Sequence, residues 1–158
     1  LYNAPGFTGV TLEYQTIAHL STHPNIVGLK DSAPSGIENF IPLNRPDFCV
    51  MAGSANFMYP TLIRGLCGGI VSLGNIVPHQ AFQLWKLGIE GGSSEGQDLH
   101  DRMESANKRI SGTYGVPGVK AAMDIAGLAG GYPRHPLKRL EGVDRNAVRQ
   151  ALIEVQLL

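Results

Sequence analysis

Lys30 is the residue of this sequence that is best placed for covalent chemistry. It ends the apolar run Ile26–Lys30 and is followed by Asp31 and Ser32, a pair typical of a loop or a helix start. The run predicts a strand of a parallel sheet, and active sites lie where the carboxyl ends of such strands meet. Two-residue alternation then places Gly28 and Lys30 on one face of the sheet.

Two interpretations of Lys30 are open from the residues alone. A lysine walled by apolar neighbours loses solvation, which disfavours its ammonium form. The neutral amine can attack a ketone and form an imine, which acts as an electron sink for carbon–carbon bond cleavage. Alternatively, Lys30 is an ordinary strand-end lysine whose amine reaches solvent. Spacing alone favours this second interpretation, because lysines at strand ends are common.

The elements around Lys30 alternate between short apolar runs and amphipathic stretches, which predicts an α/β fold. Each run is apolar on both faces, as in a parallel sheet that is covered on both sides. Strands are predicted at residues 26–30, 48–52 and 69–73, and residues 1–3 resemble the end of one more. Helices are predicted between them at residues 12–23, 37–43 and 58–66.

After residue 77 the pattern predicts helices only. Phe82, Leu84, Trp85 and Leu87 give an apolar face to a helix over residues 80–89. Ser94 is the expected cap of the next helix. Pro117 is expected in the first turn of a third helix, which runs to Leu128. Asp144 is expected to cap a last helix that reaches Leu157.

Composition excludes several classes of function. The net charge is zero, so the chain lacks the basic surface of a nucleic-acid-binding protein. No apolar run approaches the roughly 20 residues of a membrane span. Charged residues make up 16% of the 158 residues, against roughly 25% in typical domains, which suggests surfaces that are covered by something else. The start at Leu1 lacks the features of a signal peptide. Cys49 and Cys67 lack metal-type spacing, and two buried, reduced thiols in an intracellular protein are expected.

An ordered series of motifs resembles the dihydrodipicolinate synthase / N-acetylneuraminate lyase family. The resemblance covers nearly the whole chain at family-like spacings. The motifs are Tyr2-Asn3-Ala4-Pro5, Gly28-Leu29-Lys30-Asp31-Ser32, Ala52-Gly53-Ser54, Gly69-Ile70-Val71-Ser72, Tyr114-Gly115-Val116-Pro117-Gly118 and Pro133-Arg134-His135-Pro136. It implies the second half of a TIM (β/α)8 barrel, strands five to eight, with C-terminal helices. Residues 1–77 would form the half barrel, and residues 78–158 its last helix and the C-terminal helical segment.

The resemblance also implies roles for individual residues. Lys30 would form the Schiff base with pyruvate or another 2-oxo acid. Tyr2 would lie over the imine and transfer protons, for which a phenol beside an iminium cation is well placed. Without the family, Tyr2 would be taken as a strand-end aromatic that packs against a helix.

Further candidates come from the later strand ends. Ser32 could bind a substrate hydroxyl or carboxylate, or simply cap a helix, with equal weight for both. Ser54 and Ser72 could line the same cavity, and Ile70 matches a position whose backbone lies near the imine lysine. His19 and His23 lack a third ligand, so no metal site is predicted. Lys120 is expected to be structural, and no special role is expected for Asp124.

Two departures from the family pattern are visible. Phe7 stands where synthases that make dihydrodipicolinate place an arginine for the semialdehyde carboxylate. Nothing in the chain matches the Gly-Thr/Ser-Thr-Gly-Glu type of loop that binds the 2-oxo acid carboxylate in the first half of the family's barrel. The chain is therefore expected to be a fragment, one part of a split molecule, or a half barrel that dimerises.

The sequence thus predicts a Schiff-base lyase or aldolase that cleaves or condenses 2-oxo acids (pyruvate or glyoxylate with an aldehyde), of the 4-hydroxy-2-oxoglutarate or 2-keto-3-deoxy sugar-acid aldolase type. The alternatives are a dihydrodipicolinate synthase and a catalytically incomplete half-barrel assembly module. No cofactor beyond the lysine is required. Expected partners are a small-molecule 2-oxo acid, and further copies of the chain or a complementing N-terminal half, but neither nucleic acid nor membrane. A cytoplasmic or mitochondrial location is expected.

Overall fold

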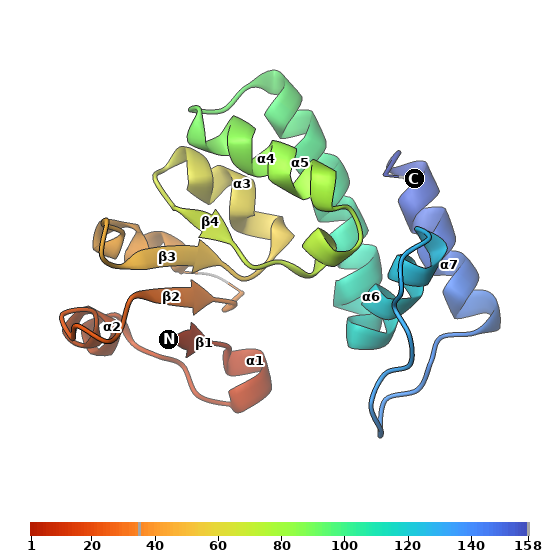
Figure 1. The fold of residues 1–158 in the computed structure, drawn as a ribbon, viewed down its shortest axis with the longest axis horizontal. Coiled ribbons are helices and arrows are strands. Elements are labelled where there is room, and N and C mark those ends of the chain that lie inside the picture. Colours follow the sequence, from red (N-terminus) through yellow and green to blue (C-terminus); the bar gives the residue numbers. More distant parts are fainter. Residues whose placement is uncertain (35, 158) are drawn as a thin grey trace.

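A four-stranded parallel sheet lies at the centre of the fold. The computed structural model describes residues 1–34 and 36–157. The strands β1 (Tyr2–Asn3), β2 (Gly28–Asp31), β3 (Cys49–Ala52) and β4 (Gly68–Gly69) lie side by side in chain order. All three pairings are parallel, so the carboxyl ends of the strands point the same way (Figure 1). The predicted α/β class is confirmed, and the sequential order is that of a partial barrel.

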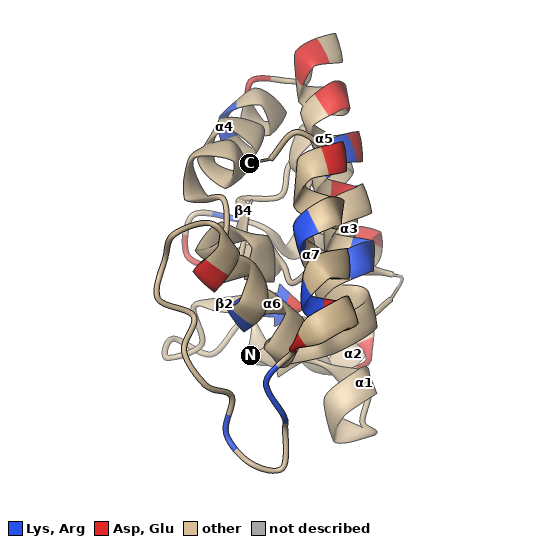
Figure 2. Cartoon of the chain, turned by 90° about the vertical axis from the view of Figure 1, so that its right-hand side faces the viewer, with Lys and Arg blue, Asp and Glu red and all other residues tan. Residues whose placement is uncertain are grey.

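Helices lie between and after the strands. The first part contains the short α1 (Pro5–Thr8), α2 (Tyr14–Leu20), the 3-10 helix η1 (Ile37–Leu43), α3 (Ala55–Ile63) and the 3-10 turn η2 (Ser72–Asn75). The second part consists of α4 (Pro78–Ile89), α5 (Ser94–Asn107), the π-helical turn η3 (Lys108–Gly112), α6 (Thr113–Ile125) and α7 (Gly142–Glu154). Acidic and basic residues are interspersed along the outer helices, which fits the zero net charge (Figure 2).

The core lies on one side of the sheet only. Leu29 and Val50 are buried among apolar residues of η1 and α3, and the same core continues into α5 and α7 through Met103 and Leu152. Residues that alternate with them, such as Gly28 and Met51, are only half-buried. The prediction that both faces are covered is therefore wrong for the described residues, because no second layer lies against the inner face.

Several element boundaries differ from the predicted ones. The strand expected at 69–73 is only Gly68–Gly69, and Ser72 already lies in η2. Ser93, not Ser94, caps α5, because its side chain accepts a hydrogen bond from the Gly96 amide at 3.1 Å. In α7 the capping position is Glu141, and Asp144 lies in the first turn. Capping depends on local backbone geometry, so the spacing of apolar residues locates it only to within a few residues.

The C-terminal half of α6 begins as predicted. Gly115 has φ 59° and ψ −142°, which interrupts the helical backbone, so Pro117 stands near the start of the segment that follows. A left-handed φ favours glycine at this point. Proline at a first helical turn sacrifices no intrahelical hydrogen bond.

The two cysteines are free but only half-buried, so the expectation that both thiols are buried is wrong. Cys67 donates a hydrogen bond to the Val50 carbonyl at 3.1 Å. Burial, together with the neighbouring Cys49, raises the pKa of the Cys67 thiol to about 12. No helix in the described part of the chain has the length and apolar character needed to cross a membrane.

Candidate active site

Lys30 and Tyr2 lie beside each other at the carboxyl ends of β2 and β1. The strand register pairs them directly, and the Lys30 amide donates to the Leu1 carbonyl at 3.0 Å. The Lys30 Nζ lies 4.4 Å from the centroid of the Tyr2 ring. An amine cation at this distance is attracted to the face of the ring. Lys30 is half-buried, while Tyr2 is 51% exposed, so the pair is open to a ligand.

The register is held from the opposite face of the sheet by Asn3 and Asp31. The Asn3 side-chain amide donates to Asp31 Oδ1 at 2.7 Å, and Asn3 Oδ1 accepts from the Leu12 amide at 3.0 Å. Both polar side chains are buried. Burial raises the pKa of Asp31, although hydrogen bonds from Asn3 and the Ala33 amide oppose the shift. This pair fixes β1 against β2 and thereby places Tyr2 beside Lys30.

A cleft of about 660 Å³ opens in front of Lys30. Its lining comes from β1, β2, η2 and the α1 turn on one side and from η3 and α6 on the other. Five of the six predicted site residues line it: Tyr2, Lys30, Ser32, Ile70 and Ser72. Figure 1 shows the strands pointing toward the space that α1 and α6 flank.

Ser32 lies next to Tyr2 in the lining of the cleft. The two hydroxyl oxygens are 3.5 Å apart. Gly53 makes this approach possible, because a Cβ at that position would collide with the Ser32 hydroxyl and would lie 2.6 Å from the Asp31 carbonyl. The Ser32 hydroxyl caps no helix that the structure describes, which favours the first of its two predicted roles.

Ser54 is the candidate that the structure places elsewhere. Its hydroxyl accepts from the Asn56 amide at 3.2 Å, which caps α3, and from the Asn107 side chain at 3.3 Å. Ser54 is absent from the residues that line the cleft. Ser72 does line it, and its hydroxyl donates to Asn107 Oδ1 at 3.3 Å. Asn107 therefore ties Ser54 and Ser72 together behind the cleft.

The α6 wall contains residues that sequence reasoning did not select. The lining residues on η3 and α6 that were not predicted are Ser111, Gly115, Val116, Val119, Lys120 and Met123. Phe7, Gly53, Val71 and Asn75 line the cleft from the other side and were not predicted as site residues either. A signal existed for four of these residues: Gly115, Val116, Val119 and Lys120 lie in the segment from Tyr114 to Lys120, which begins with a family-like motif but was given no role in the site.

Lys120 and Asp124 hold the segment that follows α6. Lys120 Nζ donates to the Gly130 carbonyl at 2.7 Å. Asp124 Oδ1 accepts from the Gly130 amide at 2.9 Å, and Asp124 Oδ2 pairs with Arg139 at 3.1 Å. Asp124 thus anchors the loop, a role that sequence analysis did not assign. Across the described residues, no three His, Cys, Asp or Glu side chains gather in a group that could hold a metal ion.

A parallel partial barrel with a strand-end lysine that faces an open cleft is an arrangement of the (β/α) barrel class. A family model, the dihydrodipicolinate synthetase family, matches residues 1–155. The chain belongs to this family, which confirms the resemblance found in its motifs.

Relatives with established names agree with this assignment. The chain is 28% identical to a 4-hydroxy-tetrahydrodipicolinate synthase of Acetivibrio thermocellus, over 100% of the chain and 54% of the relative. It is 34% identical to the enzyme of that name from Wolinella succinogenes, over 81% of the chain and 44% of the relative. The crystal structure of dihydrodipicolinate synthase from Thermotoga maritima matches with a TM-score of 0.88 at 29% identity, over 99% of the chain and 55% of the relative.

The fold recurs in the pyruvate complex of YagE from E. coli K12, with a TM-score of 0.88 at 23% identity, over 100% of the chain and 56% of that protein. In each comparison the chain spans about half the length of the relative or less.

Proposed function

We propose that the chain carries the imine-forming part of a lyase or aldolase that acts on 2-oxo acids, with Lys30 as the nucleophile. The observation that carries this proposal is the Lys30–Tyr2 pair at the strand ends, facing the cleft. The neutral amine of Lys30 attacks the ketone carbon of the 2-oxo acid and forms a carbinolamine. Loss of water then gives the iminium ion.

Tyr2 is proposed as the proton-transfer residue. Its ring lies against the amine, and its hydroxyl is 3.5 Å from Ser32, so a proton can pass between solvent-facing hydroxyls and the reacting atoms. Tyr2 gives its proton to the carbinolamine hydroxyl, which leaves as water. In the cleavage direction, the phenolate of Tyr2 then removes the proton of the substrate hydroxyl as the carbon–carbon bond breaks. The electron pair of the broken carbon–carbon bond moves into the iminium, and an aldehyde is released. The resulting enamine is protonated on carbon, and water then releases the 2-oxo acid from Lys30.

Two narrower functions share this chemistry. The names of the relatives favour 4-hydroxy-tetrahydrodipicolinate synthase. Phe7, which stands in place of the arginine expected in that synthase, argues against it. The segments Gly53–Ala55 and Tyr114–Lys120 resemble more closely those of aldolases of the 4-hydroxy-2-oxoglutarate or sugar-acid type. Ser32, Ile70 and Ser72 are proposed to contact the substrate in either case. Residues 1–77 are proposed as strands five to eight of a barrel and residues 78–158 as its last helix and C-terminal segment, completed by an N-terminal half or by further copies.

Borohydride trapping with pyruvate tests the proposal. Borohydride reduces an imine to a stable amine, so peptide mass spectrometry locates the modified lysine. We expect an adduct on the Lys30 peptide of the full 158-residue chain, none on that peptide in Lys30→Arg, and an undiminished adduct in Lys86→Arg. Lys86 is a matched control because it is an exposed lysine on α4. A folded chain without a Lys30 adduct would overturn the proposal.

A further inference from the structure

Asn107 is a buried polar residue at a junction of three elements behind the cleft. It is 7% exposed and is the last residue of α5, directly before the π-helical turn η3. Its Nδ2 donates to Asn56 Oδ1 at 2.9 Å and to Ser54 Oγ at 3.3 Å, both at the start of α3. Its Oδ1 accepts from the Ser72 hydroxyl of η2 at 3.3 Å. One buried side chain therefore joins α3, α5 and η2.

The elements next to Asn107 belong to opposite walls of the cleft. Ser72 and Asn75 line the cleft from η2, and Ser111 lines it from η3 on the other side. Asn107 itself is absent from the lining. A π-helical turn such as η3 is rare and often lies beside a functional site. The Asn107 side chain thus connects the two walls without reaching the cleft.

The hydrogen bonds of Asn107 also fix the direction of the Ser72 hydroxyl proton. Because the Asn107 amino group donates to two acceptors on α3, its carbonyl oxygen is the atom that faces Ser72. A serine hydroxyl has a single proton, so Ser72 donates it to Asn107 and presents lone pairs to the cleft. Without Asn107 the hydroxyl would rotate freely, and η2 would lose this bond to α5.

From these contacts we infer that Asn107 is a positioning residue for imine formation, because it holds η2 and the Ser72 hydroxyl in the arrangement that receives the 2-oxo acid at Lys30. This inference rests on the proposed function, in which Ser72 contacts the substrate. Asn107 acts through Ser72 and does not line the cleft. Its loss should therefore weaken binding of the 2-oxo acid and leave the reaction of the bound acid almost unchanged.

A double-mutant cycle of Asn107→Leu and Ser72→Ala tests the inference. The initial rate at which cyanoborohydride traps pyruvate on Lys30 is measured over a range of pyruvate concentrations. We expect each single variant to raise the half-saturating concentration about fivefold, as for the loss of one hydrogen bond, and the double variant to raise it no further. The maximal rate should change by less than about twofold in every variant.

Tyr59→Phe is the matched control for a general loosening of the α3–α5 interface. The Tyr59 hydroxyl donates to the Ser93 carbonyl at 3.0 Å and accepts from the Ser93 amide at 2.9 Å, at the opposite end of α5 from Asn107. The control should leave the half-saturating concentration at the wild-type value. A rise as large as that in Asn107→Leu would overturn the inference, as would independent effects that multiply to about twenty-five-fold in the double variant.

Amide hydrogen exchange separates this inference from the proposed function. The Gly74 amide donates to the Val71 carbonyl at 3.1 Å, and the Ile76 amide to the Leu73 carbonyl at 2.9 Å, so both report on η2. Both should exchange about tenfold faster in Asn107→Leu than in the wild type, and no faster in Tyr59→Phe.

The two measurements fail in different ways. If pyruvate does not label Lys30 of the wild type, the proposed function is wrong, and exchange alone decides whether Asn107 holds η2. If pyruvate labels Lys30 but exchange at η2 is the same in Asn107→Leu and the wild type, the inference is wrong and the imine chemistry stands. Ser72→Ala breaks the same bond from the cleft side, so it gives the same exchange test if Asn107→Leu does not fold.

Discussion

Asp31 and Lys30 are consecutive residues in opposite environments. Lys30 faces the open cleft, while Asp31 points to the other side of the sheet and is 0% exposed. Asp31 Oδ1 accepts from Asn3 at 2.7 Å and from the Ala33 amide at 3.4 Å. Asp31 Oδ2 has no hydrogen-bond partner among the described residues. A buried charge with half of its acceptors unused destabilises the fold, and burial accordingly raises the pKa of Asp31.

The substitution Asp31→Asn tests this account. The folded-state pKa lies above the unfolded one, so wild-type stability is lost as pH rises from the unfolded pKa through the folded pKa. The variant keeps the acceptor for Asn3 and carries no charge. We expect it to be more stable at pH 7 by on the order of 1 kcal/mol, with the gain vanishing toward pH 3.

Urea unfolding between pH 3 and 8 measures this difference. Asp47→Asn is the control, because Asp47 is an exposed aspartate whose ion pair with Arg45 contributes little. If Asp31→Asn is less stable than the wild type by a constant amount at every pH, the charge of Asp31 does not destabilise the fold.

At the residue scale, the sequence placed Lys30 and Tyr2 at neighbouring strand ends, where the structure has them, but it did not predict the side chains that support them. Lys30 and Tyr2 belong to short motifs, and the parallel register needed only the order of the strands. Ser54 was a candidate for the cavity lining, but its hydroxyl serves both as a helix cap and as an acceptor for Asn107, 53 residues away. Asp124 was overlooked, since its partners lie in a loop without any periodic pattern.

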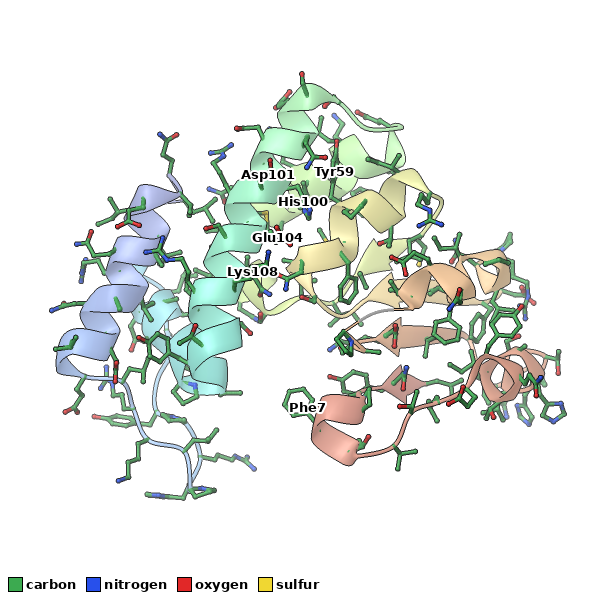
Figure 3. The ribbon with its side chains drawn as sticks, turned by 180° about the vertical axis from the view of Figure 1, so that it is seen from behind. Phe7, Tyr59, His100, Asp101, Glu104 and Lys108 are labelled. Carbon is green, nitrogen blue, oxygen red and sulfur yellow. The ribbon has the colours of Figure 1, made fainter. Side chains whose placement is uncertain are left out.

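At the element scale, the interface between α3 and α5 contains a buried histidine. His100 on α5 stacks on Tyr59 of α3 with ring centroids 5.7 Å apart (Figure 3). His100 is 6% exposed, and its Nδ1 is buried without a partner among the described residues. The Tyr59 hydroxyl also joins this contact to the start of α5, because it accepts from the Ser93 amide at 2.9 Å.

Acid should loosen this interface. Burial lowers the pKa of His100, an effect that Glu104 and Asp101 oppose and Lys108 reinforces. The folded state therefore binds fewer protons than the unfolded state between the lowered pKa and the ordinary value near 6.5. Stability should fall, by on the order of 1 kcal/mol, as pH drops through that window.

The variant His100→Phe keeps an aromatic ring against Tyr59 and cannot titrate. We expect the acid-induced loss to shrink in this variant, as measured by thermal or urea unfolding at pH 5 to 7.5. His19→Gln serves as the control, because His19 is exposed on α2. If His100→Phe retains the full pH dependence of the wild type, another group is responsible. Asp31 acts with the opposite sign, so the comparison is made on differences between variant and wild type.

Elements differed in how well the sequence predicted them. Those with a sustained apolar face, such as α4 and α5, were located to within a few residues. The fourth strand was overestimated, because Ile70–Leu73 is apolar but pairs only as far as the Ile70 amide, which bonds to the Ala52 carbonyl at 2.8 Å. Apolar runs of this length do not distinguish a strand from the turn that follows it.

At the scale of the whole molecule, the sheet is incompletely covered. Within the described residues, β1 pairs only with β2, and β4 only with β3, so both outer strands have an unpaired side. The inner face that carries Gly28, Lys30 and Met51 is half-exposed. Closed barrels leave no such edges. The chain also spans 54% of the Acetivibrio thermocellus relative. We therefore expect the proposed chemistry to need more surface than these 158 residues provide.

Little or no turnover is consequently expected from the 158-residue polypeptide alone. The proposed imine formation uses the Lys30–Tyr2 pair, whose side chains already lie against each other. Cleavage also requires an aldol substrate that is held on both sides of the breaking bond. The rate of pyruvate release from 4-hydroxy-2-oxoglutarate is measured by coupled oxidation of NADH. This rate should stay close to that of Lys30→Arg, even under conditions where borohydride traps pyruvate on the wild type. Turnover at least tenfold above that variant would contradict this expectation, because the open half would then bind and orient a whole substrate without a covered inner face.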